Sequence, residues 1–166
     1  MKRIIVSCGI FFLFCWLPVV QAGSVKLANN QPSSEIIEPS PSLSPEQVVE
    51  IQLLGLKISK GDANTTEMQQ VWRFAHPSNK AVTGPLARFA TLFDSPAYRP
   101  LLGHQDASII RLAETESRVQ MQVNVTGTDG QSYVYLWVVG KAIEGSDAGS
   151  WMTLSVSIPR GGGTQS

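Results

Sequence analysis

The sequence predicts an α+β fold in which three N-terminal helices pack on a curved antiparallel sheet of about four strands. Apolar residues recur at helical spacing over most of residues 44–102, which indicates amphipathic helices. Over residues 118–126 apolar and polar side chains alternate strictly, which is the period of a half-buried strand. The helices therefore come first and the sheet last, in one predicted domain over residues 44–160.

The composition excludes several classes of partner. The 166 residues include 13 basic and 13 acidic side chains, and no basic stripe is present that would neutralise phosphates. We therefore expect no nucleic acid partner. The sequence also lacks a phosphate-binding loop, a serine-nucleophile motif and a cluster of metal ligands, so we expect no cofactor and no metal.

Residues 1–22 have the pattern of a signal peptide. A positively charged start precedes an uncharged apolar run over residues 4–20 and a small-residue cleavage site that ends at Ala22. We expect an exported protein that is periplasmic or secreted after cleavage, and contact with a membrane only if the segment stays uncleaved. Both cysteines, Cys8 and Cys15, lie in this segment. The mature chain would therefore have no thiol for a disulfide, a zinc site or a nucleophile.

Residues 23–43 are rich in Ser, Pro and Asn and poor in core-forming residues, which predicts a disordered tether. The first helix follows it, because Ser44-Pro45-Glu46-Gln47 has the pattern of a capping box. We expect this helix to end near Ser59. Its expected inward-facing residues are Val48, Ile51, Leu54 and Ile58.

Two further helices are expected before the sheet. The second covers residues 66–75 and ends before Pro77, whose ring disfavours helix at the preceding residue. The third begins after Pro85 and ends near Asp94. Residues 161–166 are predicted to be a disordered tail. The four strands are predicted over residues 106–113, 118–126, 132–139 and 151–158.

The Asp129-Gly130 pair predicts a tight hairpin between the second and third strands. A two-residue loop there would place Val123 opposite Leu136. One face of the sheet would then be aliphatic, and the other would be uncharged and aromatic. We expect a second copy of the protein to cover the aromatic face, with a groove for sugar or peptide as the alternative. This predicted dimer or partner face comprises Tyr133, Tyr135, Trp137 and Trp151.

Two stretches of the chain resemble a known family. Residues 74–89 contain the motifs Ala75-His76-Pro77-Ser78-Asn79 and Thr83-Gly84-Pro85, and residues 98–104 contain the motif Tyr98-Arg99-Pro100-Leu101-Leu102. They resemble a family of uncharacterised bacterial and plant proteins with a domain of unknown function. That family is similar to the nuclear-transport-factor-two-like, or cystatin-like, cone. The resemblance implies a cone-like fold and attaches no activity to it.

Few residues suit catalysis. Many enzymes of the cone superfold place an Asp or a His-Asp pair on the strands that line the pocket, whereas residues 118–139 hold no carboxylate except Asp129 in the turn. His76 and His104 are the only histidines, and their ordinary pKa suits proton transfer near neutral pH. Arg88 is a candidate for holding an anionic substrate. These three are the candidate catalytic residues.

Three functions remain open at this point. In the first, the protein is a non-catalytic module that binds a small molecule or a protein and forms a homodimer through its sheet. In the second, it is an acid/base enzyme of hydrolase or isomerase type, with a pocket between the helices and the sheet. The third is a cell-envelope adaptor attached through residues 23–43. The candidate ligand-binding residues are Trp72, Asn79, Arg88 and Tyr98.

Overall fold

The computed structural model describes residues 35–157 and 160–161. The predicted signal peptide and parts of the predicted tether and tail lie outside these residues. The helices are α1 (Pro45–Ser59), α2 (Thr66–Arg73), α3 (Pro77–Thr83) and α4 (Leu86–Thr91), followed by the short 3-10 helices η1 (Leu92–Asp94) and η2 (Arg99–Leu101). The strands are β1 (Asp106–Glu114), β2 (Arg118–Thr126), β3 (Ser132–Lys141), β4 (Trp151–Val156) and β5 (Arg160–Gly161).

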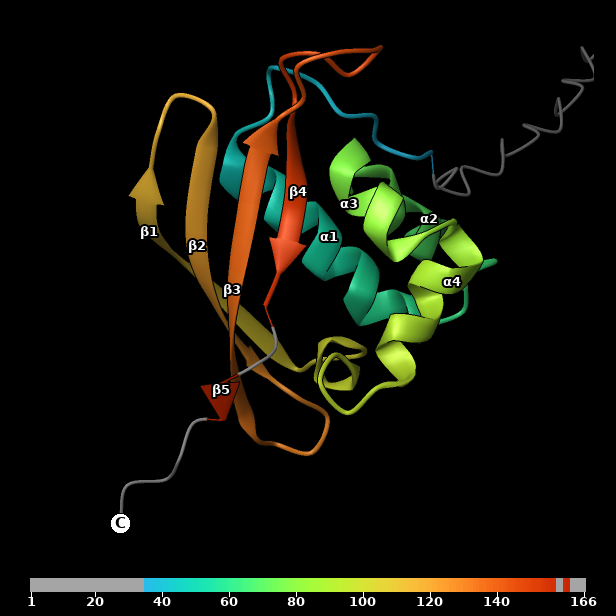
Figure 1. Cartoon of the computed structure of the whole chain (residues 1–166). Coiled ribbons are helices and arrows are strands. Elements are labelled where there is room, and N and C mark those ends of the chain that lie inside the picture. Colours follow the sequence, from blue (N-terminus) through green and yellow to red (C-terminus); the bar gives the residue numbers. More distant parts are fainter. Residues whose placement is uncertain (1–34, 158–159, 162–166) are drawn as a thin grey trace, which may run out of the picture. The chain divides into compact units, whose positions relative to one another are not determined.

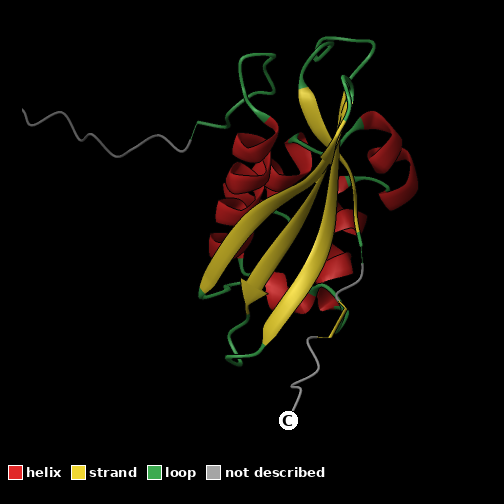
Figure 2. Ribbon diagram, turned by 90° about the vertical axis from the view of Figure 1, so that its left-hand side faces the viewer, coloured by secondary structure: helices red, strands yellow, loops and turns green. Residues whose placement is uncertain are grey.

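The described residues form two layers, a layer of helices and an antiparallel sheet, which confirms the predicted α+β class. The strand order is β1-β2-β3-β4, and β5 pairs with β3. The described helices all lie on one side of the sheet (Figure 1). The other side of the sheet, which faces the viewer in Figure 2, is not covered by a helix. Within the described residues, no helix has the length and apolar character needed to cross a membrane.

The outer edge of β4 is paired with a short segment between α2 and α3. Ala75 forms a parallel bridge with Thr153. The Thr153 N–H donates to the Phe74 carbonyl at 2.8 Å, and the His76 N–H donates to the Thr153 carbonyl at 2.9 Å. These bonds hold the segment against β4 and fix the position at which α3 begins.

Helix α1 begins with the predicted capping box. Ser44 accepts from the Gln47 backbone N–H at 3.2 Å, and the Gln47 side chain accepts from the Ser44 N–H at 2.8 Å. Its inward face differs from the prediction, because Leu54 and Ile58 are more than half exposed. This helix is apolar on several sides, so more than one stripe had helical spacing. The residues of α1 that are buried against the other elements include Val48, Val49, Gln52, Leu53 and Leu56.

Helices α1 and α2 pack closely because Gly55 has no side chain. A Cβ atom at Gly55 would lie 2.7 Å from Val71 Cγ2 and 2.8 Å from the Glu67 carbonyl oxygen. A backbone oxygen at that distance cannot move aside without displacing the helix. The contact therefore requires glycine and sets the distance between the first two helices.

The described part of the chain has four α-helices where the sequence predicts three. The difference lies at Pro77, which was expected only to end the second helix. Pro77 is the first residue of α3, with His76 as the N-cap. Proline suits the first helical position because the N–H that it lacks has no partner inside the helix. Helix α2 ends earlier, at Arg73, and Pro77 with its fixed backbone angle begins α3.

The predicted register of the β2–β3 hairpin is wrong by one residue. The Gly127 N–H donates to the Gln131 carbonyl at 2.9 Å, and the Gly130 N–H donates to the Gly127 carbonyl at 3.0 Å. These bonds leave three residues in the loop, the last of which is Gly130 in the left-handed region at φ 75°. Val123 therefore pairs with Tyr135 rather than Leu136. A one-residue shift moves every side chain of β3 to the opposite face.

The predicted aromatic partner face is consequently part of the protein interior. Tyr135 is 0% and Trp137 is 2% exposed, and both belong to the main apolar cluster. Tyr133 and Trp151 are half-buried and pack against the same cluster. Tyr135 and Trp137 are buried between the sheet and the protein's own helices, so these two rings cannot contact a second copy. The uncovered face instead carries Gln120, Gln122 and Asn124 from β2 and Val134, Leu136 and Val138 from β3.

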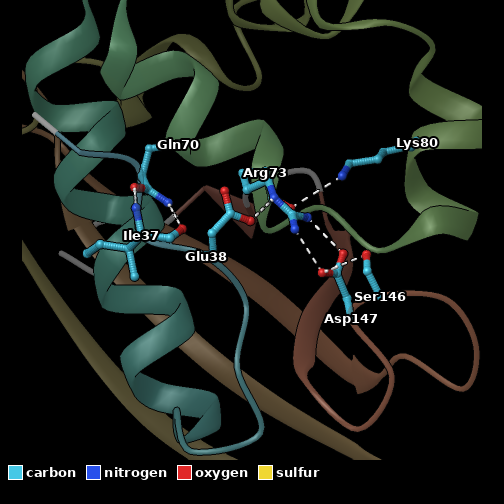
Figure 3. A network of polar contacts seen from close by, with 7 residues as sticks. All are labelled: Ile37, Glu38, Gln70, Arg73, Lys80, Ser146 and Asp147. Carbon is cyan, nitrogen blue, oxygen red and sulfur yellow. Dashed lines mark hydrogen bonds and ion pairs between the residues drawn. The ribbon is translucent and has the colours of Figure 1, made fainter.

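The last part of the predicted tether lies against the helices. The Ile37 N–H donates to Gln70 Oε1 at 2.6 Å, and Gln70 Nε2 donates to the Ile37 carbonyl at 2.8 Å. Arg73 pairs with Glu38 at 2.5 Å and, through two parallel bonds of 2.8 Å, with Asp147 (Figure 3). Residues 35–43 are therefore held in place, and one arginine joins them to the β3–β4 loop.

Two neighbouring residues of β3 test the register. Because Trp137 lies in the core and Leu136 on the uncovered face, Trp137→Ala should lower the free energy of unfolding by about 3–5 kcal/mol. Leu136→Ala should lower it by less than about 1 kcal/mol. Urea denaturation in dilute solution measures both losses. A larger loss for Leu136→Ala would support the two-residue loop and the opposite facing of β3.

Candidate functional site

A cavity of about 420 Å³ lies between the helices and the β3–β4 side of the sheet. Its volume falls within the range of sites that hold small molecules, about 300–1,000 Å³. Residues from all four α-helices, both 3-10 helices, β3 and β4 border it. The lining comprises Gln52, Leu56, Val71, Ala75, Ser78, Asn79, Val82, Thr83, Phe89, Leu92, Phe93, Tyr98, Leu101, Trp137, Thr153, Leu154, Ser155 and Val156.

A chain of buried hydrogen bonds lies along one wall of the cavity. Trp137 Nε1 donates to Thr153 Oγ1 at 3.0 Å, Thr153 Oγ1 donates to Gln52 Oε1 at 2.5 Å, and Gln52 Nε2 donates to the Val71 carbonyl at 2.8 Å. An indole N–H can only donate and a carbonyl can only accept. The two ends therefore fix the direction of every bond and the orientation of the Gln52 amide.

The Gln52 amide also completes the end of α2. Val71 lies in the last turn of α2, where carbonyl oxygens have no partner within the helix. Gln52 reaches across from α1 and supplies the missing donor, while its oxygen contacts β4 through Thr153. One buried side chain thus connects α1, α2 and β4 beside the cavity.

Two of the four predicted ligand-binding residues border the cavity. Asn79 Nδ2 donates to the Leu154 carbonyl at 3.1 Å, which attaches α3 to β4. Tyr98 donates its hydroxyl proton to the Val156 carbonyl at 3.1 Å. Burial raises the pKa of Tyr98 above its ordinary value of 10.0, so the phenol is neutral at physiological pH. Both side chains are positioned on the wall, and both already bond to the protein.

The other two predicted ligand-binding residues are not part of the cavity lining. Trp72 packs against the core beneath Lys80, whose Nζ lies 4.3 Å from the centre of the Trp72 ring. The Trp72 indole N–H is buried and has no partner among the described residues. Arg88 is exposed, and its side chain lies over Gly84, where a Cβ atom would come within 2.8 Å of Arg88 Cδ. Arg88 therefore does not provide a cation inside the cavity.

Neither histidine borders the cavity. His104 is 3% exposed, and its Nδ1 is 2.8 Å from the Leu101 carbonyl, so it donates there and fixes the turn after η2. His76 Nδ1 lies 3.2 Å from the Ser78 N–H and 2.8 Å from the Ser78 hydroxyl, and accepts from the backbone as the N-cap of α3. The pKa of His76 is lowered, because the effect of burial outweighs a hydrogen bond with the Lys141 backbone that would raise it. Each histidine has a structural role in these positions.

The cavity lining carries no formal charge at neutral pH. Among the described residues that border it, Tyr98 has the only titratable side chain. The described residues also contain no cluster of three or more His, Cys, Asp or Glu side chains that could hold a metal ion. The arrangement offers a ligand a mainly apolar, partly open pocket with a few hydrogen-bonding groups on its wall.

Sequence reasoning missed Gln52 and Thr153, which hold the wall of the cavity together. Gln52 lies one helical turn from both Val48 and Leu56, so it is a lone polar residue in an otherwise apolar stripe. That pattern indicates a buried polar group with a specific partner. The sequence prediction did not identify Gln52 as buried, because it placed Leu54 and Ile58 on the inward face of α1.

Comparison with known proteins adds no relative. The chain matches no family model, and it is similar to no curated protein and no solved structure. The resemblance to the cone superfold accordingly stays a prediction.

The N-cap of α3 should weaken in acid. His76 accepts from the Ser78 N–H only while its Nδ1 carries no proton, and burial lowers its pKa in the folded state. The unfolded chain then binds the proton more readily, so this stabilisation is complete above the ordinary pKa of 6.5 and is lost as the pH falls below it. The backbone amides of α3 should exchange hydrogen faster, relative to their intrinsic rates, at about pH 5 than at about pH 7.

The matched control for this measurement is His76→Asn. Asparagine caps a helix well and does not titrate in this range. Its α3 amides should therefore exchange with the same protection at both pH values. An acid-induced loss of protection that persisted in His76→Asn would assign the effect to another group.

Proposed function

We propose that this protein is an exported, non-catalytic module that binds a small molecule in the cavity between its helices and its sheet. The observation that carries the proposal is the cavity itself, a space of about 420 Å³ that is bordered by eight elements and lined without charge. A well-formed apolar pocket with a few convergent polar groups is the usual form of a ligand site. The predicted signal peptide, residues 1–22, supplies the expectation of export.

Binding accounts for the cavity better than acid/base catalysis does. A general acid or base must lie within hydrogen-bond reach of the substrate and have a pKa near the working pH. His76 and His104 bond to backbone groups only two or three residues away in the chain, and neither borders the cavity. Tyr98 does border it, but burial shifts its pKa further away from neutrality. The lining therefore favours a binding role for this space.

The resemblance to the cone superfold is consistent with this proposal. In the described residues the helices precede the sheet and cover one of its faces, and the cavity lies between these layers. The superfold hosts binding modules as well as enzymes. The choice between them comes from the residues of the site, and these favour binding.

The first test is native mass spectrometry of the full-length protein purified from its own compartment. We expect an added small mass that solvent extraction removes. Ala75→Phe places a ring in the cavity and should abolish the added mass, because Ala75 is buried and borders this space. The control is Ala148→Phe in the exposed β3–β4 loop, which should keep it. Thermal unfolding verifies that both variants are folded.

Two results would contradict the binding proposal. One is a wild-type protein that carries no added mass and whose thermal unfolding does not respond to a library of small molecules. The other is a folded Ala75→Phe variant that retains the same added mass as the wild type.

A homodimer through the sheet is the second part of the proposal, and it now involves the uncovered face. The side chains that β2 and β3 present there between Gln120 and Thr126 and between Val134 and Val138 are all uncharged. A solvated sheet face usually carries charges, and an uncharged face suits contact with a second copy. In Figure 2 no helix lies over this face.

Light scattering of the full-length protein tests this contact. We expect the mass of two chains for the wild type and of one chain for Leu136→Lys, because the substitution places a charge in the middle of the uncovered face. Leu54→Lys, at an exposed position of α1 on the helical side, should leave the dimer intact. A wild-type protein with the mass of one chain would contradict the proposed homodimer.

A further inference from the structure

We infer that the ligand of the cavity is an uncharged molecule built mainly of hydrocarbon. This inference rests on the proposed function and names the class of ligand for the same site. Three features of the described residues support it. Most polar side chains of the lining are already hydrogen-bonded within the protein, Lys80 and Arg88 make contacts outside the lining, and Val82 is exposed.

The polar side chains of the lining are mostly bonded to the protein already. Gln52, Thr153 and Trp137 form the buried chain, Tyr98 bonds to the Val156 carbonyl, and Asn79 bonds to the Leu154 carbonyl. The Thr83 hydroxyl donates to the Asn79 carbonyl at 2.9 Å, and the Ser78 hydroxyl is 2.8 Å from His76 Nδ1. A ligand with many polar groups would find few free partners among these side chains, which is unfavourable wherever its polar groups are removed from water.

Gln52 keeps some capacity for a ligand. Its amide nitrogen has two hydrogens, and the one bond it makes among the described residues is to Val71. The side chain is 2% exposed and borders the cavity. The buried Gln52 amide can thus donate to an acceptor, such as a carbonyl or ether oxygen, on an otherwise apolar molecule.

The cations of α3 and α4, Lys80 and Arg88, make contacts outside the cavity lining. Lys80 Nζ lies over the Trp72 ring and donates to the Arg73 carbonyl at 3.3 Å. Burial, followed by the charge of Arg73, lowers the pKa of Lys80. Arg88 lies over Gly84 at the surface. A carboxylate, sulfonate or phosphate in the cavity would therefore have no counter-charge, and an unpaired buried charge is strongly disfavoured.

Helix α3 supplies the third feature. It has no buried residue, and it is held by polar contacts such as the bond from Asn79 to β4. Its apolar residue Val82 borders the cavity and is 75% exposed. A hydrocarbon ligand would cover this side chain and give α3 the apolar contact that helices of globular proteins normally have.

A matched pair of fluorescent probes tests the inference. N-phenyl-α-naphthylamine is neutral, and anilinonaphthalene sulfonate has the same rings with one added sulfonate. The full-length protein, delipidated by solvent extraction, should bind the neutral probe at least about 100-fold more tightly than the sulfonate, because the lining provides no counter-charge. Fluorescence titration gives both dissociation constants.

Two substitutions at exposed aliphatic residues locate the bound probe. Val82→Asp should weaken binding of the neutral probe at least about tenfold, because it replaces an apolar contact at the cavity with a charge. Ile143→Asp should leave binding unchanged, because Ile143 is 87% exposed and lies outside the lining. Neither residue has a buried side chain, so both variants should fold.

The outcomes separate this inference from the function on which it rests. If the sulfonate binds as tightly as the neutral probe and Val82→Asp weakens its binding, the site binds small molecules but the uncharged class is wrong. If the neutral probe binds equally well to wild type and Val82→Asp, the cavity is not its site and the inference fails. If neither probe binds and the purified protein carries no added mass, the proposed function fails as well.

Discussion

The hydrogen-bond chain from Trp137 through Thr153 to Gln52 and the Val71 carbonyl is the constraint on which the cavity depends. It joins the sheet to α1 and α2 at a place where apolar packing alone would allow the layers to slide. Buried polar groups are costly unless every member is paired. The chain therefore admits essentially one arrangement of these three elements, and that arrangement leaves the space beside them open.

Local patterns in the sequence predicted much of the fold. The capping box at Ser44 and the alternation over residues 118–126 each depend on neighbouring residues, and both features are present in the structure. The facing of β3 was not predictable in the same way. It depends on whether two or three residues form the turn at Gly130, and a difference of one residue exchanges the two faces of the strand.

The candidate site was harder to predict because it is assembled from distant segments. Asn79 and Tyr98, two of the predicted ligand-binding residues, border the cavity, and both lie in the motifs that carry the family resemblance. Gln52 and Thr153 are 101 residues apart in the chain. The hydrogen bond between them depends on the rotation of α1 about its own axis relative to β4. That rotation is set by the packing of the helices on the sheet, which neither local segment encodes alone. Arg88 is exposed outside the cavity lining, and its side chain lies against Gly84.

The pairing of residues 74–76 with β4 also affects how the chain behaves in crowded surroundings. An open strand edge presents unpaired backbone groups that recruit strands from other molecules and lead to aggregation. Here the Phe74 carbonyl and the His76 N–H occupy the edge of β4 at Thr153. A segment that borders the cavity thereby also blocks strand addition at this edge. A change that frees this segment would expose the protein to self-association and would also disturb the cavity.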